Sequence, residues 1–119
     1  VRLSAESGPG ARIEHRMGDA AANPYTHTAA VLQAARLGVA NAYKLQPAET
    51  GDCLENKDAT HSVPGTLAGA LDALEADTVL TQALGEGLVA NHVGIKRHEI
   101  ERTAGLEGDA LRDHYIRFI

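Results

Sequence analysis

The stretch Arg12-Ile13-Glu14-His15-Arg16 carries charged side chains at alternate positions. Read as a β-strand, it places Arg12, Glu14 and Arg16 on one face and turns Ile13 and His15 to the other. A row of cation, anion and cation is poor core material, so these groups face solvent, pair with one another or contact a polar ligand such as a phosphate or a metal ion. The residues leave two interpretations open: a structural network of ion pairs, or a phosphate or substrate site.

Cations are concentrated near the start of the chain, where Arg2 joins Arg12 and Arg16. Residues 47–87, in contrast, contain eight acidic residues and a single basic one, Lys57. The formal net charge of -5 argues against a nucleic-acid partner. Any anion site is therefore expected near the N-terminal arginines.

Neither of the common glycine-rich phosphate loops, G-x-x-x-x-G-K-[ST] and G-x-G-x-x-G, occurs in the sequence. A nucleotide would have to be held by side chains, and Arg2, Arg12 and Arg16 are the candidates. Glu14, between two arginines, is expected to have a lowered pKa and to stay ionised, as a ligand of Mg²⁺ or Mn²⁺ must be.

The histidines do not form a recognisable metal motif. His98-Glu99 begins the zinc-protease pattern H-E-x-x-H, but Arg102 stands where the second histidine belongs. His92 lies six residues before His98, which places the two on different sides of a helix. Two further histidines lack visible partners, namely His27 and His61.

The single cysteine, Cys53, cannot form a disulfide within the chain, which favours a reducing, cytoplasmic setting. No run approaches the ~20 apolar residues that span a bilayer. We therefore expect a soluble protein without a membrane partner.

The charged residues are expected on a short β-element. Residues 1–3 and 11–16 are predicted to form two strands of a hairpin, because Ser7-Gly8-Pro9-Gly10 between them supplies turn residues. Two strands alone are not stable in water, so this element must rest on other structure.

A long helix is expected over residues 23–45, ending near Lys44. Asn23 can cap free amide groups, and the fixed φ of Pro24 suits the first helical position. The expected packing face recurs at helical spacing and contains Tyr25, Ala29, Leu32, Val39 and Tyr43.

The remainder is predicted as an exposed loop over 46–65 and further helices over 66–119. The predicted caps and stops are Thr66, Asp77, Gly85, Gly105 and Asp109, with a longer helix over Leu88 to Ala104. The last helix should dock through Leu111, Tyr115 and Phe118. The predicted fold class is mainly α with a short N-terminal β-hairpin.

One longer pattern resembles a known family. After Arg16, two residues lead to Asp19, and three alanines separate it from Asn23-Pro24-Tyr25. This spacing resembles the C-terminal catalytic signature of the glutamine synthetase family. The resemblance continues through Pro64-Gly65-Thr66-Leu67 and a helix with Lys96 and Glu99, to Tyr115.

The resemblance implies that residues 1–119 are the C-terminal helical portion of a glutamine synthetase-type α+β catalytic domain, corresponding to about the last quarter of such an enzyme. It also implies roles for four residues. Glu14 looks like a ligand of Mg²⁺ or Mn²⁺, Arg16 looks like the catalytic arginine facing the transferred phosphoryl group, and Arg12 and Arg2 look like contacts to the phosphates of ATP.

By this resemblance, the whole enzyme would couple glutamate to ammonia or a larger amine through γ-glutamyl phosphate and would assemble into a ring-like homo-oligomer. His15, Met17 and Gly18 look closer to members that use larger amines. The 119-residue chain alone is expected to be inactive. The alternative is a non-catalytic helical packing or assembly domain derived from the family.

Overall fold

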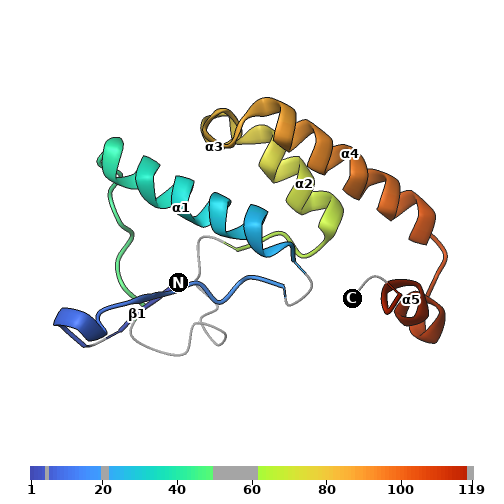
Figure 1. Ribbon diagram of the computed structural model, residues 1–119, viewed down its shortest axis with the longest axis horizontal. Helices are drawn as coiled ribbons and strands as arrows, with labels where there is room; N and C mark the ends of the chain where they lie inside the picture. The colour runs from blue at the N-terminus through green and yellow to red at the C-terminus, as the bar shows by residue number, and fades with distance from the viewer. Residues whose placement is uncertain (5, 20–21, 50–61, 118–119) are drawn as a thin grey trace.

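The computed structural model describes the chain except residues 5, 20–21, 50–61 and 118–119. Its described part contains five α-helices and one two-stranded antiparallel hairpin, which confirms the predicted fold class (Figure 1). The elements are β1 (Arg2–Leu3), a 3-10 turn η1 (Gly8–Gly10), β2 (Ile13–Glu14), α1 (Pro24–Ala40), α2 (Leu67–Ala76), α3 (Thr78–Leu84), α4 (Glu86–Thr103) and α5 (Gly108–Tyr115). No helix in the described residues is both long and apolar enough to cross a membrane.

The hairpin pairs Arg2 with Glu14 and Leu3 with Ile13. Its strands are shorter than predicted because the chain leaves the ladder at Ser4, whose amide donates to the Arg12 carbonyl (3.1 Å) and whose Oγ accepts from the Arg12 amide (3.0 Å). Both apolar members, Leu3 and Ile13, are 67 % exposed. Burial of apolar surface therefore does not anchor the hairpin.

Helix α1 begins as predicted. The Asn23 side chain accepts hydrogen bonds from the amides of Tyr25 (3.0 Å) and Thr26 (3.2 Å), and Pro24 occupies the first helical position.

Helix α1 ends at Ala40, before the predicted end near Lys44. Ala42 has a positive φ of 49°, its amide donates to the Val39 carbonyl, and the Tyr43 amide donates to the Gly38 carbonyl. These two bonds form a Schellman closure, which the sequence conceals because glycine is the usual residue at the left-handed position.

The face of α1 that packs differs from the prediction. Tyr25 and Val39 are 83 % and 84 % exposed, and Leu32 is exposed as well. Instead α1 contacts α3 across a groove, lined by Ala34, Leu37 and Tyr43 on one side and Asp77, Val79 and Leu80 on the other. Only Tyr43 of the expected face lines this groove. The contact forms where small or aliphatic side chains of α1 meet α3.

The core lies between α2, α3 and α4, which contact one another. In Figure 1, α2 and α4 run side by side and α3 lies at one end of this pair. The buried residues of the core are Leu71, Val89 and Val93, with Leu74, Leu84 and Ile100 packed around them. Two of the predicted caps are confirmed: Thr66 Oγ1 accepts from the Gly69 amide (3.1 Å) and Asp77 Oδ1 from the Leu80 amide (2.9 Å). Gly85, at φ +99°, ends α3 and lets α4 begin at Glu86, two residues before the predicted start.

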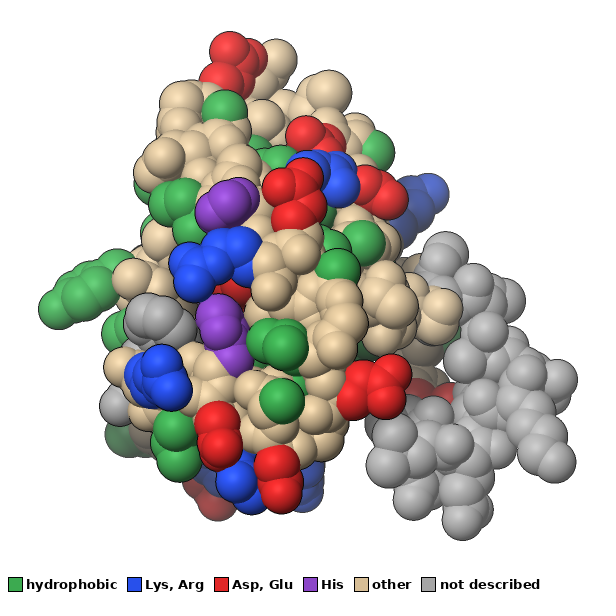
Figure 2. All heavy atoms as spheres, turned by 90° about the vertical axis from the view of Figure 1, so that its right-hand side faces the viewer, with side chains coloured by type: hydrophobic (Ala, Val, Ile, Leu, Met, Phe, Trp, Pro, Cys, Tyr) green, Lys and Arg blue, Asp and Glu red, His purple; other side chains and the backbone are tan. Residues whose placement is uncertain are grey.

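Helices α2 and α4 are also linked at the surface, where Arg97 forms ion pairs with both Asp72 (2.7 Å) and Glu75. Figure 2, which views the right-hand side of Figure 1, shows acidic, basic and histidine side chains interspersed on that face. Surface charges of this kind contribute little to stability individually.

A polar contact between Tyr115 of α5 and Glu99 joins helix α5 to α4. The Tyr115 hydroxyl donates to Glu99 Oε1 (2.8 Å), while Lys96 Nζ lies 2.7 Å from Glu99 Oε2. The contact raises the pKa of Tyr115. Burial opposes ionisation of Glu99, but Lys96 and Tyr115 together leave its pKa below the usual range. Tyr115 thus docks the last helix, as predicted, and Phe118 lies outside the described residues.

Asp109 does not cap α5. The helix begins at Gly108, and the capping position is Glu107, which makes no side-chain cap bond. Asp109 lies in the first turn and pairs with Arg112 (2.9 Å). Gly108, at φ +52°, reverses the backbone one residue before the predicted cap. Of the predicted loop over 46–65, residues 50–61 are outside the described residues, and the rest contains no helix or strand.

Replacing Leu71 with alanine should lower the free energy of unfolding by about 2–5 kcal/mol, because it removes a buried side chain from a core of few residues. Urea denaturation measures this loss. The control is Leu67→Ala on the same helix, where the side chain is 41 % exposed and the expected loss is below about 1 kcal/mol. Equal losses in the two variants would contradict a core centred on Leu71.

Tyr115→Phe should weaken docking of α5 by about 1 kcal/mol, the value of one hydrogen bond. Because the pKa of Tyr115 is raised in the folded state, the stabilisation is fully present below about pH 10 and is lost as pH rises through the folded-state value. NMR signals of α5 followed from pH 8 upward measure this loss. The phenylalanine variant should not show the alkaline transition, and Tyr43→Phe should retain it. An unchanged alkaline transition in Tyr115→Phe would refute the assignment of this transition to ionisation of Tyr115.

Candidate phosphate and metal site

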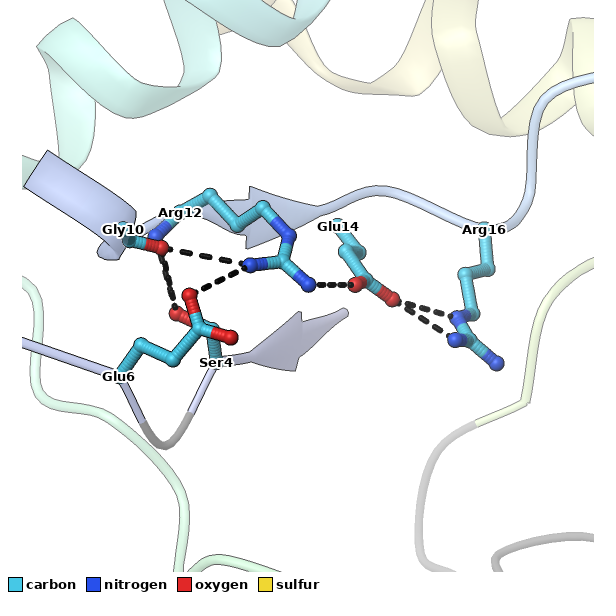
Figure 3. A network of polar contacts seen from close by, with 6 residues as sticks. All are labelled: Ser4, Glu6, Gly10, Arg12, Glu14 and Arg16. Carbon is cyan, nitrogen blue, oxygen red and sulfur yellow. Dashed lines mark hydrogen bonds and ion pairs between the residues drawn. The ribbon is translucent and has the colours of Figure 1, made fainter.

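The extended backbone of β2 and its flanks brings Arg12, Glu14 and Arg16 together, as Figure 3 shows. Arg16 donates to Glu14 Oε2 through Nε (3.0 Å) and Nη2 (2.7 Å). Arg12 Nη2 lies 3.4 Å from Glu14 Oε1. The carboxylate is thus held between two guanidinium groups. The three charged side chains lie on one face, as their alternate positions in the sequence predicted.

Arg12 is supported from the other side by the connection between the strands. Its Nη1 donates to Glu6 Oε2 (3.2 Å) and to the Gly10 carbonyl (3.3 Å). Ser4 Oγ donates to the same carbonyl (3.4 Å). The turn η1 causes this arrangement by folding Glu6 back under Arg12 (Figure 3).

Sequence reasoning missed Glu6 because its contact with Arg12 depends on the path of the turn. The short sequence separation and the opposite charge were the only available signals. Ser4 was likewise unassigned, although a hydroxyl at the end of a strand is a common backbone partner.

The pKa of Glu14 is lowered, chiefly by its hydrogen bonds from Arg16 and further by the charges of Arg16 and Arg2 and the hydrogen bond from Arg12, against a smaller opposing effect of burial. Glu14 is therefore ionised at neutral pH, as a metal ligand must be. Arg2 is opposite Glu14 in the strand register and acts on it through charge. It is less closely placed than Arg12 and Arg16, each of which contacts the carboxylate directly.

The two guanidinium groups remain accessible. The side chains of Arg12 and Arg16 are 55 % and 62 % exposed, whereas Glu14 is 27 % exposed. Arginine presents planar, paired donors that match phosphate oxygens. The geometry can therefore accept an anion on its solvent side while Glu14 stays between the cations.

Glu14 offers one carboxylate to a metal ion. Within the part of the chain that the structure describes, no group of three or more His, Cys, Asp or Glu side chains is arranged to hold a metal. Oε2 receives both bonds from Arg16, but Oε1 has a single longer contact with Arg12. A carboxylate has about four lone-pair positions, so Oε1 could serve as one ligand of a hard cation such as Mg²⁺ or Mn²⁺.

Arg12, Glu14 and Arg16 form a charged row on one face of the segment. His15 lies on the other face and contacts His27 of α1, with ring centroids 5.2 Å apart. His27 thus has a partner that the sequence did not reveal, because the contact joins a strand to a helix. His61 lies outside the described residues. His98 lies near Glu101 (3.7 Å) on α4, away from this site.

Comparison with known proteins identifies relatives over most of the chain. The family model described as "Glutamine synthetase, catalytic domain" matches residues 1–113. The glutamine synthetase of Pyrococcus abyssi is 38 % identical over 109 residues, covering 85 % of this chain and 24 % of the relative. The glutamine synthetase of Methanococcus maripaludis is 37 % identical over 112 residues, covering 87 % and 25 %.

A differently named relative, the dog protein lengsin, is 34 % identical over 111 residues, covering 92 % of this chain and 18 % of lengsin. No solved structure matches the chain significantly. The chain spans a quarter or less of the length of these curated relatives. Because the family model matches nearly the whole sequence, the chain belongs to the glutamine synthetase catalytic-domain family.

Proposed function

We propose that this chain forms part of an ATP-dependent ligase that joins the γ-carboxylate of glutamate to ammonia or a larger amine. The observation that supports this function is the ionised Glu14 carboxylate held between the exposed guanidinium groups of Arg12 and Arg16. Membership of the family supplies the reaction class, since its named relatives include glutamine synthetases.

The reaction has two steps. An oxygen of the glutamate γ-carboxylate attacks the γ-phosphorus of ATP, the bond to ADP breaks, and γ-glutamyl phosphate forms. The amine nitrogen then attacks the acyl carbon, inorganic phosphate leaves with the carbon–oxygen bond electrons, and the nitrogen loses a proton. Both steps spread negative charge over phosphate oxygens, so fixed cations stabilise them.

The residues of this chain divide that task. Arg16 faces the transferred phosphoryl group and neutralises charge that develops on it. Arg12, and Arg2 at longer range, contact the nucleotide phosphates. Glu14 would provide Oε1 as one ligand of Mg²⁺ or Mn²⁺, and that ion would supply positive charge that neutralises the phosphates.

The proposal assigns only part of a site to this chain. Further metal ligands, the glutamate pocket and the amine pocket would come from the portion of the family's catalytic domain that these 119 residues do not represent. A ring-like homo-oligomer and a cytoplasmic location belong to the same proposal.

A non-catalytic packing or assembly role is the second candidate. It is favoured by one observation: Arg12, Glu14, Arg16 and Glu6 satisfy one another without any ligand. Under this alternative the charged row stabilises the hairpin and has no preference for nucleotide or metal.

Mn²⁺ with ATP should bind the chain weakly, and Glu14→Gln should reduce the affinity at least about tenfold, or about 1.4 kcal/mol, because the amide keeps the shape but loses the anionic oxygen. Titration followed by Mn²⁺ electron paramagnetic resonance measures this change. Since the pKa of Glu14 is lowered, binding should persist below the usual titration range of glutamate and disappear as pH falls through the lowered value.

The matched control is Glu101→Gln on α4, an exposed glutamate near a histidine, which should leave the affinity unchanged. Equal affinities of the wild type and Glu14→Gln would refute the metal role. Binding lost in both glutamate variants would indicate a general effect of net charge.

The isolated chain should release no phosphate from ATP in the presence of glutamate and ammonia or a panel of amines. The reason is that Glu14 is a single metal ligand, and productive phosphoryl transfer needs both substrates fixed in line. Phosphate release and γ-glutamyl product formation are the measurements. Turnover by the 119 residues alone would contradict the division of the site proposed above.

A further inference from the structure

The hairpin that carries Glu14 has little to hold it in place. Its two strands have two residues each, and their apolar side chains, Leu3 and Ile13, are largely exposed. Ion pairs among Arg12, Glu14 and Arg16 lie within the hairpin and its flank, so they do not fix its position relative to the helices. Some other contact must set the position of the charged row.

In the described part of the chain, contacts of His27 connect the hairpin segment to helix α1. Its ring lies 5.2 Å from the ring of His15, centroid to centroid, with the planes inclined by 56°. His15 stands between Glu14 and Arg16 in the sequence, and the alternation of side chains along an extended segment places it on the face opposite theirs. A contact on His15 therefore holds the backbone that carries both charged residues.

Gly18 brings the same segment against the other part of the His27 ring. A Cβ atom at this position would lie 2.8 Å from Cε1 of His27, closer than real Cβ atoms approach other groups, and 3.1 Å from Nε2, tighter than most Cβ contacts. The absence of a side chain at residue 18 is thus what permits the approach. His15 and Gly18 together place the segment 15–18 on one side chain of α1.

His27 is itself well fixed. It lies in the first turn of α1, where its amide donates to the Asn23 carbonyl (3.0 Å) and the neighbouring Thr26 is held by the Asn23 cap. Helix α1 in turn packs on α3, beside the core of α2 and α4. A continuous path therefore runs from the helical core through His27 to the charged row.

We propose that His27, acting through His15 and Gly18, is a positioning residue that fixes the segment bearing Glu14 and Arg16 against helix α1. The functional importance of this position rests on the function proposed above. In phosphoryl transfer a misplacement of about 1 Å can reduce the rate about a hundredfold, so a short exposed strand needs such a support.

Residual dipolar couplings of backbone amides test the placement, using the 119-residue chain without added metal. In the wild type, the couplings of residues 13–18 should fit the same alignment frame as those of α1. In His27→Ala they should be averaged toward zero, while α1 keeps its own couplings because alanine favours helices. Gly18→Ala should have the same effect by displacing the ring, and should have no additional effect in the His27→Ala background.

Two further variants separate positioning from a general structural defect. His27→Phe keeps an aromatic ring and should restore the couplings that His27→Ala loses, whereas His98→Ala, a histidine on α4, should leave them unchanged. Unaltered couplings of residues 13–18 in His27→Ala would overturn the inference.

Mn²⁺ with ATP supplies the functional readout. The relaxation enhancement of α1 amides, relative to that of β2 amides, should fall in His27→Ala and recover in His27→Phe. If the ratio of α1 to β2 relaxation enhancement is the same in wild type and His27→Ala, the positioning role of His27 is overturned. If Mn²⁺ affects no β2 amide of the wild type while the couplings behave as expected, the metal role of Glu14 fails and the positioning of the segment by His27 is supported.

Discussion

The charged row depends on one interaction, the carboxylate of Glu14 shared between Arg12 and Arg16. Without Glu14, two guanidinium groups on one face of a short strand would repel each other. Without the arginines, Glu14 would be an ordinary surface carboxylate. Exposed ion pairs contribute about 0–1 kcal/mol to stability, so this triad is a weak reason for the chain to fold. Its main consequence is chemical, because it fixes the charge and orientation of three groups in advance.

Stability must therefore come from elsewhere, and the helices provide it. Leu71, Val89 and Val93 are the buried residues of the described chain, and they join α2 to α4. Helix α1 is attached to this unit through α3 and leaves Tyr25 and Val39 on its exposed side. The site is thus carried by an element at the edge of the helical unit. The position of the site relative to the helices depends on the first turn of α1, where the Asn23 cap and His27 lie.

The features that the sequence predicted correctly depend mainly on neighbouring residues. Asn23, Thr66 and Asp77 are caps because each offers a side-chain oxygen to amides two or three residues away. The alternation of Arg12, Glu14 and Arg16 needs only an extended backbone. The family pattern also depends on spacing alone.

Features that join distant segments could not be predicted in the same way. The end of α1 depends on Ala42 adopting a left-handed conformation that tertiary context selects, and the packing face depends on where α3 lies. Glu6 reaches Arg12 through a turn, Tyr115 reaches Glu99 across two helices, and His15 meets His27 between strand and helix. Each contact requires knowledge of the chain path, which residue types and periodicity do not contain.

In the proposed metal site, the two arginines would both prepare Glu14 for a cation and compete with that cation. They lower its pKa, so that the anionic form is present at neutral pH, but Arg16 occupies Oε2 with two hydrogen bonds. The longer contact of Arg12 leaves Oε1 less committed. Because Arg12 also contacts Glu6 and the Gly10 carbonyl, it has other acceptors when an anion or a cation arrives. The asymmetry therefore distinguishes the two arginines in the proposed site: Arg16, which would face the phosphoryl group, also orients the carboxylate through Oε2, and Arg12 would be the partner that yields Oε1 to a metal ion.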